Sequence, residues 1–232
     1  MKKGNQCRLL HLNNSRNLYK WMDIKKSYID RFGYTVQETD DYVTFTNEFG
    51  LTEFRKYKGN DAIVTIPDGV NVISSDSFYR SKVEEVVLPD SVLAISHRAF
   101  QDCNCLKSIT IPESIEAIDD YAFDGCISLQ SINIPEHLER LQKYAFSNTG
   151  LKTAIFPRGI KDSPYGPVYK SCPNLEKAII MESEMVFNTG EFSKCDKLKD
   201  IYYDGPVKNL PPLIKQKIEK KKSIVLHKCQ EL

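Results

Sequence analysis

The 232-residue sequence lacks any apolar run approaching the ~20 residues that a membrane-spanning helix needs. The residues after Lys2 and Lys3 also lack the apolar segment of a secretory signal, because Arg8 and His11 interrupt it. If Met1 is the native start, the expected location is therefore the cytoplasm. If the start has been trimmed, a cell-surface or secreted location is expected instead.

An excess of charge of one sign is also missing. The chain has 32 basic and 31 acidic residues, which gives a formal net charge of +1. A general binder of nucleic acid or of a membrane surface would carry a basic field, so neither partner is expected. The short run Lys220-Lys221-Lys222 is interpreted as an exposed helix end.

Motifs that carry catalysis are absent from the sequence. It contains no glycine-rich phosphate loop, no G-x-S-x-G and no H-E-x-x-H. Cys103-Asn104-Cys105 lies near His97 in the sequence, but a zinc site needs about four converging ligands. We therefore expect no catalytic residues, no metal and no cofactor. The enzymatic alternative is a site within residues 1–60.

Seven cysteines are present, an odd number that excludes complete pairing. Four of them occupy one position of a repeated pattern: Cys103, Cys126, Cys172 and Cys195. Stacked repeats place equivalent residues about 4.8 Å apart, whereas a disulfide needs Cβ atoms at roughly 3.5–4.5 Å. The pattern therefore predicts a column of buried free thiols.

The repeated pattern runs from about Val64 to residue 205. An aromatic residue recurs in steps of 22 or 23 residues, and so does a proline. The aromatic column is Phe78, Phe100, Phe123, Phe146, Tyr169 and Phe192, and the proline column is Pro67, Pro89, Pro112, Pro135 and Pro157. A fixed period of this length is typical of a solenoid, whose repeats bury their apolar sides against their neighbours.

Each repeat is predicted to add one strand to a single parallel sheet. Leu106, Ile109 and Ile111 are expected to point inward, and the next proline ends the strand. Ile132 and Ile134 are predicted core residues at the equivalent positions of the following repeat. The Ala-Phe pair that precedes each cysteine is expected to begin a short helical turn.

The pattern F-x-x-C-x-x-L-x-x-I-x-I-P, with alanine before the phenylalanine, resembles the BspA-like leucine-rich repeats. The resemblance covers about residues 61–205 and implies an α/β repeat protein, a right-handed curved solenoid with a parallel β-sheet and six repeats. It also implies a bacterial or protist protein that binds other proteins. Many members are surface adhesins, and the family supplies no catalytic residues.

Two terminal caps are predicted to flank the repeats. Residues 1–14 are expected to be a disordered lead, and residues 15–60 to form an N-terminal helix and a β-hairpin that turns at Asn47–Gly50. Residues 206–232 are predicted as a C-terminal cap, with a helix over Leu213–Lys222 and an apolar run at Ile224-Val225-Leu226. The repeats occupy residues 61–205.

The outward-facing strand positions indicate a candidate binding surface, because packing does not dictate them. One outward column becomes apolar at Ile155, Ile179 and Tyr202, flanked by Lys152 and Lys177. An irregular Pro/Gly-rich loop at residues 158–167 is expected to lie beside it. Contiguous exposed apolar area tends to mark an interaction site, so this strip is predicted to bind a protein or peptide on the concave sheet.

Other interpretations of these residues remain open. The C-terminal tail would bury the strip if it folded over it. The chain would be a surface adhesin fragment if it bound a host protein or a carbohydrate. It would be a structural spacer if no outward column were chemically distinctive. The oligomeric state and the identity of the partner are not predicted.

Overall fold

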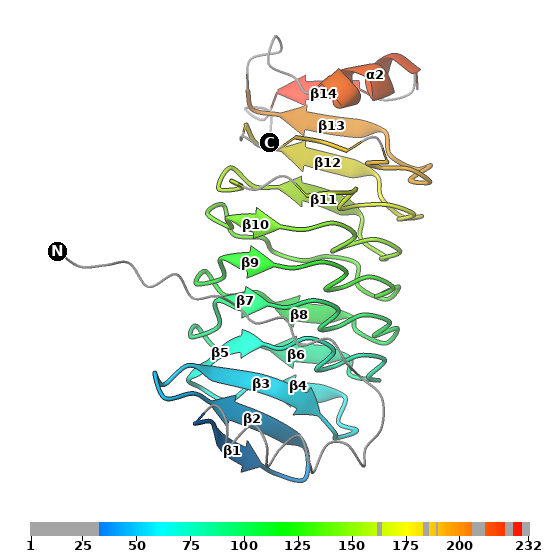
Figure 1. The fold of residues 1–232 in the computed structure, drawn as a ribbon. Helices are drawn as coiled ribbons and strands as arrows, with labels where there is room; N and C mark the ends of the chain where they lie inside the picture. The colour runs from blue at the N-terminus through cyan, green and yellow to red at the C-terminus, as the bar shows by residue number, and fades with distance from the viewer. Residues whose placement is uncertain are drawn as a thin grey trace, which may run out of the picture.

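A computed structural model describes residues 33–161, 164–182, 186–188, 190–205, 212–220 and 225–228. They form an elongated stack of coils, with β1 at one end and α2 at the other (Figure 1). The predicted lead at residues 1–14 and the predicted helix at residues 15–31 lie outside the described residues.

Each coil has two sides, which we name the strand side and the return side. The strand side contains β4 (Ile63–Thr65), β6 (Glu85–Val87), β8 (Ser108–Thr110), β11 (Thr153–Phe156), β12 (Lys177–Ile180) and β13 (Asp200–Tyr203). The return side contains β5 (Val70–Ile73), β7 (Ala94–Ile95), β9 (Ala117–Ile118) and β10 (Arg140–Leu141). The caps contain β1 (Thr35–Glu38), β2 (Tyr42–Thr46), β3 (Thr52–Tyr57), α2 (Pro212–Lys220) and β14 (Val225–Lys228).

The prediction of one strand per repeat in one sheet is wrong. The return-side strands pair in parallel with one another in a second sheet, in the order β3-β5-β7-β9-β10. Most of these strands are only two residues long, and both residues of β7 are buried. A two-residue strand with no exposed side cannot show the alternation that identifies a strand in a sequence.

The predicted helical turn at the Ala-Phe pair is also wrong. The residue two positions before the phenylalanine has a left-handed backbone in four successive repeats, with φ from 55° to 59° at Asp76, Arg98, Tyr121 and Tyr144. The residue two positions after each of these phenylalanines is left-handed as well, with φ from 54° to 80° at Arg80, Asp102, Gly125 and Asn148. A right-handed helix needs φ near −60°, and only three residues lie between the two left-handed positions, too few for a turn of α-helix. Tight turns take its place, closed by bonds such as Ala99 N–H to Ser96 O at 3.2 Å.

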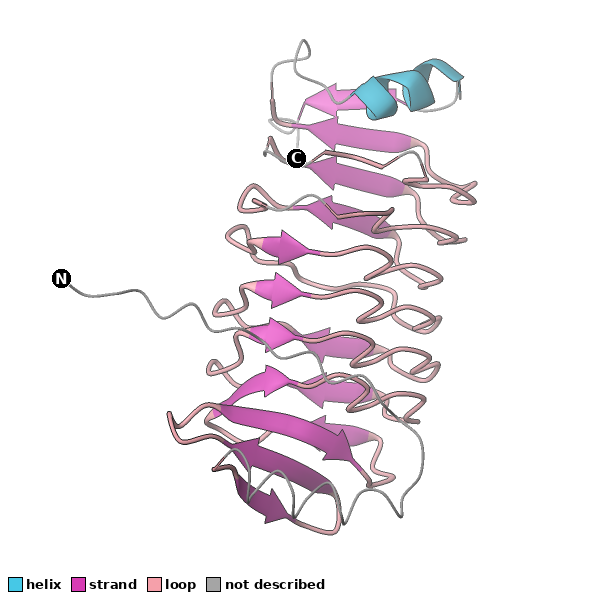
Figure 2. Ribbon diagram, viewed as in Figure 1, coloured by secondary structure: helices cyan, strands magenta, loops and turns pink. Residues whose placement is uncertain are grey.

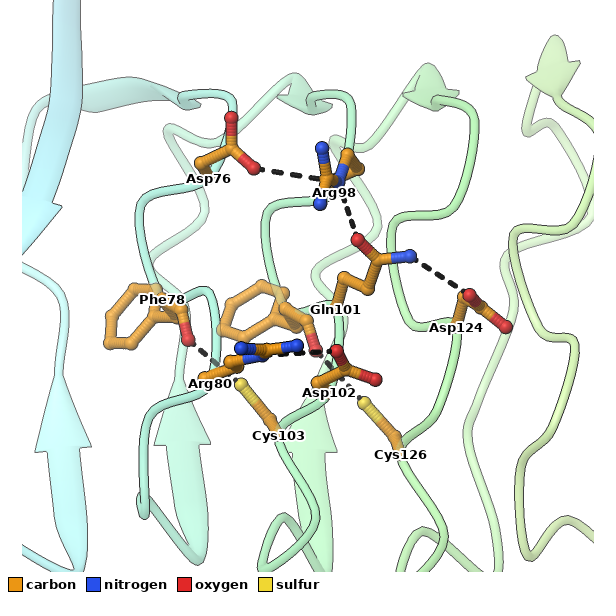
Figure 3. A network of polar contacts seen from close by, with 10 residues as sticks. Asp76, Phe78, Arg80, Arg98, Gln101, Asp102, Cys103, Asp124 and Cys126 are labelled. Atoms are coloured by element: carbon orange, nitrogen blue, oxygen red, sulfur yellow. Dashed lines mark hydrogen bonds and ion pairs between the residues drawn. The ribbon is translucent and has the colours of Figure 1, made fainter. Parts of the chain in front are cut away.

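Polar side chains connect these turns from coil to coil (Figure 3). Arg98 Nε lies 3.6 Å from Asp76 Oδ1 in one coil and also donates to Gln101 Oε1. The Gln101 amide then donates to Asp124 Oδ2 in the next coil at 2.9 Å. The Asp76–Arg98 and Gln101–Asp124 contacts join residues 22 and 23 positions apart, so they reinforce the stacking of coils.

The aromatic column forms the predicted internal spine. Successive rings stack with centroids 4.8 Å apart for Phe78 and Phe100 and 5.2 Å apart for Phe100 and Phe123. The stack continues to Tyr169, but Phe192 packs edge-on to Phe156 instead, at 5.9 Å. The predicted core isoleucines Ile109, Ile111, Ile132 and Ile134 are all buried, which confirms the register of the repeats.

The four cysteines of the repeat column are buried and unpaired, as predicted. Cys103 donates its thiol proton to Phe78 O at 2.9 Å, and burial raises the pKa of Cys103 to about 12. Cys195 departs from this arrangement because the carbonyl of Tyr169 accepts the Phe192 N–H instead. Contact with the Cys172 thiol, together with burial, raises the pKa of Cys195 far above its ordinary value.

The strand side is divided into two sheets at the fourth coil, where residues 131–134 form no strand (Figure 2). The Asn133 amide donates to Ile111 O at 2.7 Å and accepts from Ile111 N–H at 3.2 Å. On the other side of the break, the Tyr169 hydroxyl bonds to both Ile155 N–H and Ile155 O, each at 3.1 Å. Two side chains thus bond to backbone groups that a continuous parallel ladder would use.

Both ends of the stack carry additional strands. At the N-terminal end, β1, β2 and β3 pair antiparallel, and β3 joins the return side by pairing in parallel with β5. At the C-terminal end, β14 pairs in parallel with β13, and Ile214 of α2 is buried in the core. Each added segment covers part of the terminal coil, β3 on the return side and β14 on the strand side, and repeat arrays need such caps for solubility.

Candidate functional site

The residues of the predicted strip lie in one row across three strands. Ile155 pairs in register with Ile179, and Ile179 pairs with Tyr202. Side chains alternate between the two faces of a strand, so the buried neighbours of these residues point into the core. We name Ile155, Ile179 and Tyr202, with Lys152 and Lys177, the strand-side strip.

The apolar residues of the strip are half-buried rather than fully exposed. Ile155 packs partly against the core. The Lys177 ammonium lies 4.8 Å from the centroid of the Tyr202 ring, within range of a cation–π interaction. The strip is therefore a surface of half-buried apolar side chains, with the Lys177 ammonium over its one aromatic ring, that of Tyr202.

Lys152 lies at the edge of the strip and is exposed. Its backbone is held on both sides, since Lys152 N–H donates to Gln130 O at 3.2 Å and Lys152 O accepts from Glu176 N–H at 2.9 Å. A long cationic side chain on a fixed backbone is suited to contact an acidic group on a partner.

The strand β14 of the C-terminal tail does not fold over the strip. β14 pairs edge to edge with β13, so Tyr202 is in register with His227. Strands that pair in this way lie in one sheet, and their pairing leaves the outer face of the sheet uncovered. The row that begins at Ile155 is therefore lengthened by one strand.

The irregular loop lies mainly on the return side, so the prediction that it flanks the strip is wrong. Lys161 N–H donates to Glu139 O at 2.9 Å, beside β10, and Tyr144 N–H donates to Pro167 O. Only the start of the loop reaches the strand side, where Arg158 forms an ion pair with Asp204, which follows β13. The side on which the loop lies could not be predicted from the sequence, because the loop has no repeat pattern.

Sequence reasoning missed the side chain that the loop displays. Tyr165 is 94% exposed, whereas Pro164, Gly166 and Pro167 around it are buried. The Asn188 amide donates to Gly166 O at 3.2 Å and also contacts Pro164 O, which fixes the turn. The tetrapeptide Pro-Tyr-Gly-Pro is the signal that could have identified an exposed aromatic on a rigid turn.

The described residues bring no metal-ligating set together. Among the residues described, no group of three or more His, Cys, Asp or Glu side chains could hold a metal ion. Cys103 is buried, Cys105 is exposed, and His97 packs edge-on to Tyr121 at 5.8 Å. Burial lowers the pKa of His97.

In the described part of the chain, no helix is both long and apolar enough to cross a membrane.

The chain matches a model of a known protein family. The model for the BspA type leucine rich repeat region matches six copies, over residues 48–165 and 94–215. These ranges cover more than half of the chain and include every repeat inferred from the aromatic column. No curated protein matches the chain.

Several solved structures share the fold. A leucine-rich repeat protein from Bacteroides ovatus has 29% identity and a TM-score of 0.63, over 72% of this chain and 46% of that one. Pneumococcal vaccine antigen PcpA has 18% identity and a TM-score of 0.65, over 83% and 47%. A leucine rich cell surface protein from Faecalibacterium prausnitzii has 24% identity and a TM-score of 0.53, over 75% and 40%. This chain therefore spans less than half of each of these proteins.

Proposed function

Because the chain belongs to the BspA-type leucine-rich repeat family, we propose that it is a non-enzymatic module that binds a protein or peptide through the strand-side strip. Solenoids present extended surfaces built from equivalent positions of successive repeats. The strand-side strip is a surface of this kind.

The observation that carries the proposal is the in-register row of Ile155, Ile179 and Tyr202. The two preceding outward positions of the same column, Thr110 and Asn133, are polar and exposed, and Val87 before them is half-buried. Apolar residues gathered on an otherwise polar outer face tend to mark interaction sites, and tyrosine is enriched among residues that dominate binding energy. The change in chemistry at the fourth coil coincides with the division of the sheet.

A surface adhesin is the alternative function. A location at the cell surface is supported by the similarity to the Faecalibacterium cell surface protein, and the partner would then be a host protein or carbohydrate. Sugar rings stack on open aromatic faces, but the Lys177 ammonium stands over one face of the Tyr202 ring at 4.8 Å. A protein or peptide partner is therefore favoured over a carbohydrate.

Tyr202→Ala tests the proposed site. Partners captured by the intact chain are identified, and the affinity of each is measured by calorimetry for the native chain and the variant. We expect Tyr202→Ala to weaken binding by more than about 1 kcal/mol, the level that marks an important contact. Thr110→Ala, at the same outward position four coils earlier, is the matched control and should bind normally.

Thermal unfolding of the same variants separates binding from folding. Because Tyr202 is half-buried on the outer face, its truncation should shift the melting temperature only slightly. Loss of the folded state in Tyr202→Ala would show that the row is structural. Unchanged affinity for every captured partner would place the binding surface elsewhere, and Lys107, Thr110 and Asn133 of the earlier coils are then the next residues to substitute.

A further inference from the structure

Within the repeats, four strands stand at the end of a sheet: β4, β8, β10 and β11. Three of them meet another part of the chain. The Asn133 side chain bonds beside β8, the Lys161 N–H donates beside β10, and the Tyr169 hydroxyl bonds to β11. The strand β4 pairs with β6 on one side, and on its other side no described strand pairs with it.

The geometry of the β4–β6 pair shows which backbone groups are open. Ala62 O accepts from Glu85 N–H at 2.9 Å, and Ile66 N–H donates to Val87 O at 2.9 Å. In a parallel pair, alternate residues direct both backbone polar groups to the same neighbour. Val64 therefore also faces β6, whereas Ile63 and Thr65 direct their N–H and C=O groups away from it.

The exposure of the edge agrees with this assignment. Ile63 is 62% exposed and Thr65 is exposed, while Val64 between them is 8% exposed and belongs to the core. Among the described residues, the backbone groups of Ile63 and Thr65 have no hydrogen-bond partner. An open edge of this kind is a template for pairing with another chain.

We propose that the edge of β4 binds an extended segment of a partner protein, which adds one strand to the β4-β6-β8 sheet. This site is separate from the strand-side strip and does not depend on it. Only an extended backbone places its donors and acceptors at the spacing that Ile63 and Thr65 present.

The other end of the stack shows that the strand side accepts such a segment. There, β14 comes from outside the repeats and pairs in parallel along all four residues of β13. The return side is closed at its N-terminal end by β3, whereas the strand side begins with β4 (Figure 1). The partner segment would take the position before β4 that β14 takes after β13.

Charge and burial define the segment that fits. A side chain that points inward would lie beside Val64 and must be apolar. On the outer face, Ile63 is in register with the exposed Glu85, and Asp61 and Asp68 flank the strand and are exposed. An outward lysine or arginine would therefore lie near the Asp61 and Asp68 carboxylates, with Glu85 one strand further away, so the preferred segment alternates aliphatic and basic residues.

Hydrogen exchange of the full-length chain tests the state of the edge. The amides of Ile63 and Thr65 should exchange fast, while those of Val64 and Ile66, which face β6, should exchange slowly. Adding a blocked hexapeptide of alternating valine and lysine should slow exchange at Ile63 and Thr65. The same peptide with proline at its third position, or with glutamate for lysine, should have little effect.

Thr65→Pro removes one outward N–H and no bond to β6, and proline is tolerated at such edge positions. The variant should bind the valine–lysine peptide about tenfold more weakly. This is the effect of losing one backbone hydrogen bond whose contribution lies at the upper end of the usual range. Thr65→Val, which keeps the N–H, is the matched control and should bind normally. If Thr65→Pro fails to fold, the hydrogen-exchange measurements on the native chain decide whether the β4 edge binds the peptide.

Each contrary result overturns the proposal in a recognisable way. Slow exchange at Ile63 and Thr65 in the isolated chain, at every concentration, would mean that the chain covers its own edge. Protection that increases with protein concentration would identify a second copy as the occupant. Fast exchange that the valine–lysine peptide leaves unchanged would show that the edge takes no strand.

Discussion

The thiols of Cys103, Cys126 and Cys172 each donate to the carbonyl oxygen of a phenylalanine in the preceding coil, at 2.9, 3.1 and 3.2 Å. Each cysteine thus fills the core as a small side chain and bonds to a carbonyl that belongs to the neighbouring coil. The same residue type serves packing between coils, which explains why it recurs at one repeat position.

Thiol labelling tests this arrangement at individual residues. Cys105 is exposed and should react quickly with a maleimide in the folded chain at pH 7.5, whereas Cys103 and Cys126 should react only after denaturation. Because burial raises the pKa of Cys103 to about 12, raising the pH to 9 should leave its labelling slow. Peptide mapping by mass spectrometry gives the extent of maleimide labelling at each cysteine. Labelling of Cys103 at the rate of Cys105 would contradict the structure.

Ile132 tests the core at the coil that lacks a strand. It is 9% exposed, so Ile132→Ala should lower the free energy of unfolding by about 2–5 kcal/mol, as truncation of buried aliphatic residues does. Ile127 in the same coil is 61% exposed, and Ile127→Ala should change stability by less than about 0.5 kcal/mol. Denaturant unfolding of both variants gives the comparison, and equal effects would show that the register is wrong.

At the scale of elements, the division of the strand side depends on two side chains that bond to backbone. Burial raises the pKa of Tyr169 and keeps its hydroxyl protonated, so it can donate to Ile155 O while it accepts from Ile155 N–H. One hydroxyl thereby satisfies both polar groups of a residue in the strand-side strip. The only tyrosine in the aromatic column thus positions β11 as well as filling the spine.

Restoring the consensus residue at this position should therefore destabilise the protein. Tyr169→Phe keeps the ring but leaves Ile155 N–H and O without their partner, which should cost about 1–3 kcal/mol in the free energy of unfolding. Tyr144→Phe is the control, because the Tyr144 ring stacks on Tyr121 and its hydroxyl makes no hydrogen bond with the described residues. Its effect should stay within about 0.5 kcal/mol. A neutral or stabilising Tyr169→Phe would show that the hydroxyl has no such role.

At the scale of the whole molecule, each coil depends on the coils on either side of it. Rings stack between successive coils, thiols bond to the preceding coil, and side chains such as Gln101 reach to the next. The two end caps have no repeat pattern, yet each adds a strand to one side of the stack: β3 to the return side and β14 to the strand side. The strand-side strip and the β4 edge therefore lie in different parts of the same stack.

The sequence alone determined the period, the inward residues and the candidate strip. Spacing identified Phe100, Ile109 and Cys103 as core, and all three are buried. It also placed Ile155, Ile179 and Tyr202 at one outward position, where they lie in register. These features can be predicted because the position of a residue within the repeat indicates whether its side chain faces the core of its own coil.

The tertiary structure decided the features that depend on neighbouring coils. The two-residue strands of the return side, the division of the sheet at Asn133 and Tyr169 and the placement of the loop over β10 all follow from hydrogen bonds to adjacent coils. The open edge of β4 likewise depends on which segment lies beside it. Such partners lie more than ten residues away along the chain, and the pattern within one repeat carries no information about them.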